Sequence, residues 1–384
     1  MSVKNVEDAY PLSPMQEGLL FHNLYAPESG LYVAQYACEM QNVDVDALRR
    51  AWQTIVDRHT AFRTAFVWKN VEKPLQVVGR RVELPFQLED WRALAASEQQ
   101  QQLDSYLETD RQRGFALNKA PLLRIALFQT SDDTHQLVLS HHHITVDGWS
   151  MALVFKEAFA LYEAFAAGHD LQLPPTTSYR NYIAWLQQQD LNQAETFWRE
   201  NLKGFTTPTP LVIDRVSTVH EEAYAEQHVK LSTSTTAALQ TLARQHQLTM
   251  NTLVQGAWAL LLSRYSDEHD VVFGSVIAGR PGALPNVETT VGIFINNLPV
   301  RVRVEPGMQL IPWLQKLQEQ ESEARQYEYS PLAQVQGWSD VPRGVSLFDS
   351  IIAFQNFPST PARETASARS VRCARLNRKT IRSR

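Results

Sequence analysis

The sequence is organised around residues Ser140–Ser150, which read Ser-His-His-His-Ile-Thr-Val-Asp-Gly-Trp-Ser. An apolar run, Leu137–Leu139, precedes the histidines and predicts a buried strand that ends where they begin. Histidine is the side chain whose ordinary pKa permits acid or base chemistry near neutral pH. Asp147 and Gly148 follow where the strand is expected to give way to a helix, with Gly148 relaxing the backbone. The stretch predicts a reactive histidine held rigidly at the end of a strand.

The three consecutive histidines also raise the question of a metal. On a strand, His141 and His143 share one face while His142 points to the opposite face. Two histidines supply two zinc ligands, and a site needs a third ligand at workable spacing. The sequence offers no such third ligand, so a metal site is not expected.

The segments on either side predict a mixed α/β protein. A helix is expected to start at Ser13 as N-cap with Pro14 in its first turn. The other elements of the first half are strands at Tyr32–Met40, Pro121–Gln129 and His135–Ser140, and helices at Asp46–His59, Ser97–Glu108, Val154–Phe165 and Tyr179–Trp198. Those of the second half are helices at Ser234–Gln247, Met250–Tyr265 (capped by Thr249) and Pro312–Tyr327, and strands at Asp270–Ala278, Val291–Val304 and Leu347–Phe357. The order βαβαβ in each half suggests an α/β sandwich, with the proline-containing segment Leu173–Ser178 as the boundary between two lobes.

Length and composition set the class. A chain of 384 residues is long for one core and suggests two lobes. Two cysteines, Cys38 and Cys373, make a disulfide framework unexpected and fit a reducing cytosol. The first residues carry charges and no apolar core, so no signal peptide is expected. Polar residues interrupt the longest apolar helix, Thr252–Tyr265, so no membrane span is expected either, and the predicted location is cytoplasmic.

Charge is distributed unevenly along the chain. The net charge is -5, but the last 26 residues hold seven Arg and one Lys against one Glu, a charge of +7 that leaves -12 on the other 358. A body this acidic argues against nucleic acid as a partner. The basic segment 359–384 lacks apolar periodicity and is expected to be disordered.

The motifs together resemble a known family. His142–Gly148 is similar to the His-His-x-x-x-Asp-Gly signature of condensation domains from nonribosomal peptide synthetases. Five companion blocks resemble those of the family and occur in the family's order: Tyr10–His22, Arg58–Phe66, Tyr179–Trp185, Val291–Asn297 with Arg301, and Tyr327–Leu332. The likeness covers roughly residues 7–358, and the blocks are jointly specific.

The resemblance implies an architecture that spacing alone does not show. Such domains have two chloramphenicol-acetyltransferase-like lobes arranged as a V, with the histidine motif at their junction. Here the lobes are expected at residues 1–175, which carry the motif, and 176–358, followed by the tail at 359–384. Family members continue beyond residue 358 with further strands and helices. The second lobe is therefore expected to be incomplete, with a C-terminus that is truncated or altered.

The resemblance also implies a reaction. One carrier-protein-bound substrate enters the tunnel from each side, and the upstream aminoacyl or peptidyl thioester is joined to the amine of the downstream aminoacyl thioester. The substrates arrive on phosphopantetheine arms of the carrier domains, so the domain itself is expected to bind no cofactor. The implied partners are upstream and downstream carrier domains and an adjacent adenylation domain, in a synthetase of secondary metabolites such as antibiotics.

Roles for the signature residues follow from the same resemblance. His143 occupies the family's second-histidine position and is the expected central residue, either as a base toward the amine or as a group that positions it. His142, Asp147 and Gly148 complete the catalytic motif. In the family the aspartate pairs with an arginine, which Arg280 matches, and such a pair would lock the turn beneath the catalytic ring.

Supporting positions carry weaker assignments. Arg63 and Asn296 are expected to line the tunnel or to be structural, and Trp149 to pack. Two residues depart from the family pattern: His141, where an apolar residue is common, and Asn297, where threonine is usual.

Two other functions fit the same sequence. The first is a free-standing acyltransferase that moves an acyl group from a thioester to an alcohol or amine with the same histidine. The second is a non-catalytic fragment that only docks carrier proteins. Within the condensation family, Leu12–Gly18 resembles subtypes that accept a donor of D configuration.

Overall fold

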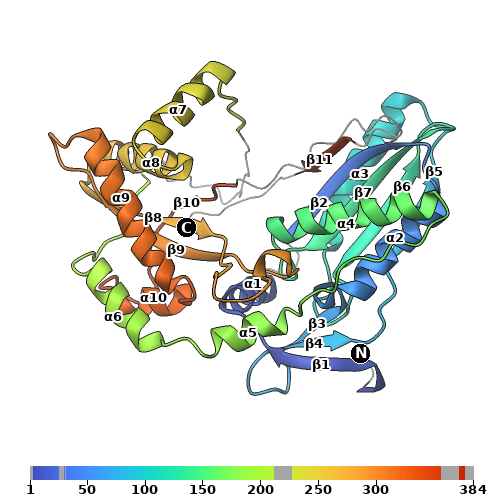
Figure 1. Ribbon diagram of the computed structural model, residues 1–384, viewed down its shortest axis with the longest axis horizontal. Helices are drawn as coiled ribbons and strands as arrows, with labels where there is room; N and C mark the ends of the chain where they lie inside the picture. The colour runs from blue at the N-terminus through green and yellow to red at the C-terminus, as the bar shows by residue number, and fades with distance from the viewer. Residues whose placement is uncertain (1–2, 26–29, 31, 212–226, 356–371, 377–384) are drawn as a thin grey trace, which may run out of the picture. The chain divides into compact units, whose positions relative to one another are not determined.

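The computed structural model describes residues 3–25, 30, 32–211, 227–355 and 372–376, and it divides into two compact units (Figure 1). Unit 1 comprises the described residues of 1–188, 280–294 and 356–379, and unit 2 those of 189–279 and 295–355. Both units combine helices with β-sheets, so the predicted mixed α/β class is confirmed.

Unit 1 is built on a five-stranded sheet in the order β11-β2-β7-β6-β5. At its centre, β7 (Thr134–His142) lies antiparallel to β2 (Val33–Gln41) and to β6 (Leu123–Gln129). On the far side of β6, β5 (Phe86–Asp90) pairs in parallel, and β11 (Arg372–Leu376) pairs antiparallel with β2. The strand that carries the histidines is therefore held by ladders on both sides.

Helices cover both faces of this sheet. On one face, α2 (Val45–Arg58) and α4 (Gly148–Ala166) share a hydrophobic core with Leu139 of β7. The opposite face packs Val138 against α3 (Ala96–Arg113). Neighbouring residues of β7 thus enter different cores, and each fully buried aliphatic side chain contributes about 1.5–3 kcal/mol. This double burial fixes the register of β7 and hence the direction of each histidine.

A smaller sheet of unit 1 adjoins the N-terminal helix. It has the order β1-β4-β3, with β1 (Val6–Pro11), β4 (Leu75–Gly79) and β3 (Thr64–Val67) all antiparallel. The helix α1 (Pro14–Tyr25) follows β1, and α5 (Arg180–Leu186) contributes to the same unit.

Two predicted helix starts are confirmed in the structure. The Gln16 N–H donates to Ser13 Oγ at 3.3 Å at the start of α1. The Thr252 N–H donates to Thr249 Oγ1 at 3.1 Å at the start of α8. In both places the side-chain oxygen satisfies an N–H that has no partner within its helix.

Unit 2 contains a three-stranded sheet in the order β10-β8-β9. In it β8 (Asp270–Ile277) is antiparallel to β9 (Asn296–Arg303) and parallel to β10 (Ile351–Ile352). Its helices are α6 (Leu191–Leu202), α7 (Thr233–Gln245), α8 (Met250–Ser266), α9 (Leu310–Ala324) and α10 (Leu332–Trp338). The described residues also form the short 3-10 helices η1 (Val3–Asn5), η2 (Thr60–Arg63), η3 (Val287–Thr289) and η4 (Arg325–Tyr327).

Three of the predicted elements are wrong in extent. The strand expected at Val291–Val304 begins only at Asn296, because side chains of other elements bind the backbone before it. Of the strand expected at Leu347–Phe357, the described residues form a strand only at Ile351–Ile352, since the residues at its start bury their side chains in the core of unit 2. Residues 356–357 of that prediction lie outside the described part of the chain. The single helix expected at Tyr179–Trp198 is instead two, α5 and α6.

The basic tail also differs from expectation. Residues 372–376 form β11 and pair with β2, whereas disorder is the expectation for the whole of 359–384. Without β11, β2 would be an edge strand, and the unpaired N–H and C=O groups of an edge strand are a template for a further strand. Residues 359–371 and 377–384 lie outside the described part of the chain.

The cysteines depart from expectation as well. Cys38 of β2 is disulfide-bonded, whereas the cysteine content made a disulfide unexpected. Its register partner on β11 is Cys373. Among the described residues, no helix combines the length and apolar character needed to cross a membrane.

Candidate active site

The three histidines come from the end of β7 and the first residue after it. The ring of His141 stacks on Tyr36, with 6.0 Å between centroids, and lies 5.9 Å from the ring of His143. The ring of His142 instead meets Tyr32 and Phe115, at 6.3 and 6.4 Å. The predicted alternation, with His142 on the opposite face, is confirmed.

His142 is fully buried and electrically neutral. Burial lowers the pKa of its imidazole from 6.5 to about 3. Its Nδ1 accepts the backbone N–H of Ile144 at 3.1 Å, so in the neutral ring the hydrogen is on Nε2. The Nε2 atom lies 3.5 Å from the side-chain amide of Asn23. A ring with this pKa is almost entirely unprotonated near neutral pH. Its Nδ1 accepts a backbone hydrogen bond.

His143 opens the turn that follows β7. Its backbone N–H donates to the Tyr32 carbonyl at 2.8 Å, and the turn closes with the Thr145 N–H on the His142 carbonyl at 3.2 Å. Of the three histidines His143 is the most exposed, at 7 %, against 1 % for His141 and 0 % for His142. All three residues are thus buried, and His143 is the least so.

Asp147 uses its carboxylate to organise backbone. One oxygen, Oδ1, caps α4 by accepting the Ser150 N–H at 2.8 Å, and Oδ2 accepts the Phe294 N–H at 2.9 Å. The Arg280 guanidinium forms an ion pair with Oδ1 at 3.4 Å. Gly148 is the first residue of α4 and has ordinary helical backbone, so the freedom expected of this glycine is not used.

Arg280 lies within the segment 280–294, which belongs to unit 1 although both of its flanks belong to unit 2. Within that segment its guanidinium donates to the Thr290 carbonyl at 3.0 Å and also to the Val287 carbonyl. The cation stacks on Phe294, 4.1 Å from the ring centroid. Arg280 therefore holds the segment that surrounds it at several points.

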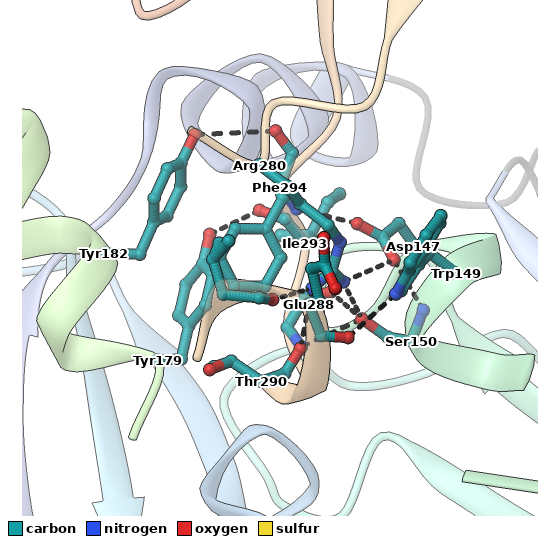
Figure 2. Close-up of polar contacts among 12 residues, drawn as sticks. Asp147, Trp149, Ser150, Tyr179, Tyr182, Arg280, Glu288, Thr290, Ile293 and Phe294 are labelled. Atoms are coloured by element: carbon teal, nitrogen blue, oxygen red, sulfur yellow. Dashed lines mark hydrogen bonds and ion pairs between the residues drawn. The ribbon is translucent and has the colours of Figure 1, made fainter. Parts of the chain in front are cut away.

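The same guanidinium reaches the start of α4. It donates to Ser150 Oγ at 2.8 Å, beside its ion pair with Asp147. Figure 2 shows these groups converging on one side of the segment. Burial lowers the pKa of the guanidinium, and the Asp147 carboxylate opposes that effect by favouring the cation.

The sequence model of the Condensation domain family matches residues 6–382. The chain belongs to the condensation-domain family.

Curated relatives of this condensation domain are much longer proteins. One of the linear gramicidin synthase subunits of Brevibacillus parabrevis is 48 % identical over 360 residues, which cover 93 % of this chain and 7 % of the relative. Surfactin synthase subunit 3 of Bacillus subtilis is 35 % identical over 368 residues, covering 96 % of this chain and 29 % of the relative. The chain thus spans less than a third of either relative.

Solved structures show the same fold. The first condensation domain of the calcium-dependent antibiotic synthetase superposes with a TM-score of 0.78 at 19 % identity, covering 97 % of this chain and 85 % of that one. The starter condensation domain of rhizomide synthetase gives a TM-score of 0.76 at 19 % identity, covering 96 % and 82 %.

The supporting residues of the condensation domain bind mostly backbone groups. Arg63 pairs with Glu7 at 2.5 Å and donates to the Gly79 carbonyl. Trp149 donates from Nε1 to the Glu288 carbonyl at 2.9 Å. Asn296, in unit 2, donates to the carbonyls of residues 328 and 330 at 2.9 and 2.8 Å. These bonds favour the structural alternative for Arg63 and Asn296.

Ser150 and Gly292 lie at the site, and the sequence had assigned neither of them a role. Ser150 is buried, and its Oγ donates to the Gly292 carbonyl at 2.7 Å while accepting the Gly292 N–H at 3.1 Å. A Cβ at Gly292 would overlap the ring of Tyr179, whose hydroxyl donates to the Ile293 carbonyl at 2.5 Å. The sequence signal for Ser150 is its place three residues after a capping aspartate, at the position whose backbone N–H such a cap binds.

His141 and His143 have no third described ligand that would complete a metal site with them. Within the ranges that the structure describes, no three His, Cys, Asp or Glu side chains gather in a way that could hold a metal ion.

Proposed function

We propose that this chain is the condensation domain of a cytoplasmic nonribosomal peptide synthetase. It joins an upstream carrier-bound aminoacyl or peptidyl thioester to the amine of a downstream carrier-bound aminoacyl thioester. The C–N bond forms as the C–S bond breaks, the amine loses a proton and the departing thiolate gains one. The substrates arrive on the phosphopantetheine arms of carrier domains, with an adenylation domain as a neighbour.

The observation that supports this proposal is that the polar side chains of the motif do different things. His142 stays neutral and binds backbone, and the Asp147 carboxylate is taken up by two N–H groups and Arg280. His143 is the most exposed histidine of the three. It stands on a turn held by His142, whose Nδ1 accepts the Ile144 N–H and whose carbonyl accepts the Thr145 N–H. We assign it to the reacting amine, which its ring orients by hydrogen bonding and can deprotonate during attack. Holding both thioesters in place supplies much of the rate, up to about 7–11 kcal/mol.

The test uses two separately loaded carrier proteins and the purified chain. Formation of the dipeptidyl thioester on the downstream carrier is followed by intact-protein mass spectrometry. His143→Ala should lower the single-turnover rate by about a hundredfold or more, the usual contribution of a positioned acid or base. His135→Ala is the matched control, because His135 is a buried histidine at the opposite end of β7.

The same assay separates the alternatives. Turnover of small thioesters onto free alcohols, without transfer between carriers, would favour a free-standing acyltransferase. Carrier binding without any product would favour a docking fragment. Equal rates for His143→Ala and His135→Ala would refute the role given to His143.

A further inference from the structure

A buried pair of glutamine side chains lies behind the histidine turn. Gln16 of α1 and Gln76 of β4 are each 1 % exposed. Gln16 Nε2 donates to Gln76 Oε1 at 3.2 Å, and Gln76 Nε2 donates to Gln16 Oε1 at 2.9 Å. Two reciprocal bonds between planar amides fix the position of both groups.

The orientation of the Gln16 amide is determined by backbone groups around it. Its Oε1 also accepts the Ser13 N–H at 2.9 Å, and a backbone N–H can only donate. The Oε1 atom must therefore face Ser13, which directs Nε2 to the Ile144 carbonyl, where it donates at 3.2 Å. Gln76 Nε2 is anchored separately by the Pro11 carbonyl at 2.9 Å.

This bond adds a third hold on the backbone around His143. The peptide before His143 is held by Tyr32, and the peptide after it by His142 Nδ1. The next peptide is held at both ends, by Gln16 through the Ile144 carbonyl and by the Thr145 N–H on the His142 carbonyl. Three successive peptide planes are thus fixed, and the direction of the His143 side chain follows from them.

We propose that Gln16 is a positioning residue for His143, acting through the Ile144 carbonyl. This inference rests on the condensation function proposed above. Reacting groups must be held within about 0.5 Å of their productive geometry, and a displacement of about 1 Å can cost about a hundredfold in rate. Loss of the Gln16 bond leaves the 144–145 peptide with one bond, from the Thr145 N–H to the His142 carbonyl. The peptide is then less tightly held, and the His143 ring can move while the rest of the fold persists.

Three variants test this assignment. Gln16→Met keeps the shape of the side chain and removes the bond to Ile144. Gln76→Met removes the amide pair but leaves Gln16 bound to Ile144. The double variant Gln16→Met/Gln76→Met replaces both amides together, so that neither amide is left facing an apolar side chain. The Ser13 N–H and the Ile144 and Pro11 carbonyls lose their side-chain partner in this variant, and the unfolding measurement accounts for that cost. Gln53→Met is the matched control, because Gln53 on α2 binds backbone at Val82 and Leu84 in the same manner.

The readout is the split between kcat and KM in the two-carrier assay, beside urea unfolding of each variant. We expect kcat to fall about ten- to a hundredfold in Gln16→Met and in the double variant, with KM for both carriers within about threefold. Gln76→Met should retain more kcat than the double variant. A merely structural role predicts instead that kcat follows stability, as it should in Gln53→Met.

The outcomes separate the two proposals. A double variant that folds and keeps kcat within about twofold of the unaltered chain would overturn the role of Gln16 alone. A rise in KM with unchanged kcat would also overturn it, because that pattern marks substrate binding. If the unaltered chain forms no dipeptidyl thioester, the condensation function itself fails, and the positioning role fails with it.

Discussion

The protonation state of His142 gives a prediction that needs no knowledge of the substrate. We expect the stability of the protein to fall between pH 7 and pH 5 because of this one ring, and the variant His142→Asn to lose that dependence. Asparagine cannot titrate, and its Oδ1 can take the place of Nδ1 as acceptor for the Ile144 N–H. The substitution also changes the packing around residue 142, but that cost in stability is the same at every pH.

The magnitude follows from the difference between the folded and unfolded pKa values. Burial lowers the pKa of His142 to about 3, from 6.5 in the unfolded chain. Between these two values the unfolded chain binds the proton and the folded protein does not, so stability falls as the pH drops below 6.5. Linkage gives a loss of about 2 kcal/mol between pH 7 and pH 5. His135, whose pKa burial also lowers, is present in both proteins and cancels in the comparison.

The assay is urea unfolding of both proteins at several pH values from 7 to 5. We compare how the unfolding free energy of the unaltered chain changes with pH relative to His142→Asn. A difference that grows by about 2 kcal/mol toward pH 7 supports a neutral buried ring. Parallel curves, within about 0.5 kcal/mol at every pH, would show that His142 takes up its proton in the folded state.

Two further substitutions test the holds on the segment 280–294. Asp147→Asn should lower the unfolding free energy by about 3 kcal/mol or more, because it leaves the buried Arg280 cation without its carboxylate and supplies one acceptor oxygen to two N–H groups. In urea unfolding, adding Arg280→Met should recover part of this loss. A stable and fully active Asp147→Asn would contradict the role of Asp147. Gly292→Ala should destabilise the protein by about 3 kcal/mol, because the added Cβ overlaps the buried Tyr179 ring. Gly18→Ala, whose added Cβ meets open space, should be neutral or slightly stabilising in thermal unfolding. Equal melting temperatures for the two alanine variants would contradict the packing argument.

The local sequence pattern predicted the structure correctly wherever a feature depends on a single strand or helix. The apolar run before the histidines correctly predicted a buried strand, and the twofold period of that strand correctly placed His142 opposite His141 and His143. The capping residues Ser13 and Thr249 were also found from sequence, since an N-cap depends only on its own first turn. The Asp147–Arg280 pair came from the family resemblance rather than from pattern, and the structure contains it.

Pattern failed where distant side chains bind the backbone. The apolar residues 291–295 have the composition of a strand, but Asp147, Ser150 and Tyr179 hold the N–H and C=O groups of 292–294 that a strand would pair. No local period reports such contacts. The strand β11 was missed for a related reason, because its pairing depends on the edge that β2 presents and not on its own basic sequence.

The buried polar groups around the candidate site share one property, which is that they bind backbone outside regular ladders. The contacts are His142 to Ile144, Gln16 to Ile144, Asp147 to Phe294, Ser150 to Gly292 and Tyr179 to Ile293. A backbone group buried in a loop needs a partner as much as one in a strand does, and here side chains supply that partner. Within the motif, His142, Thr145 and Asp147 all bind backbone through their side chains. Under the proposed function, this support is what places the ring of His143.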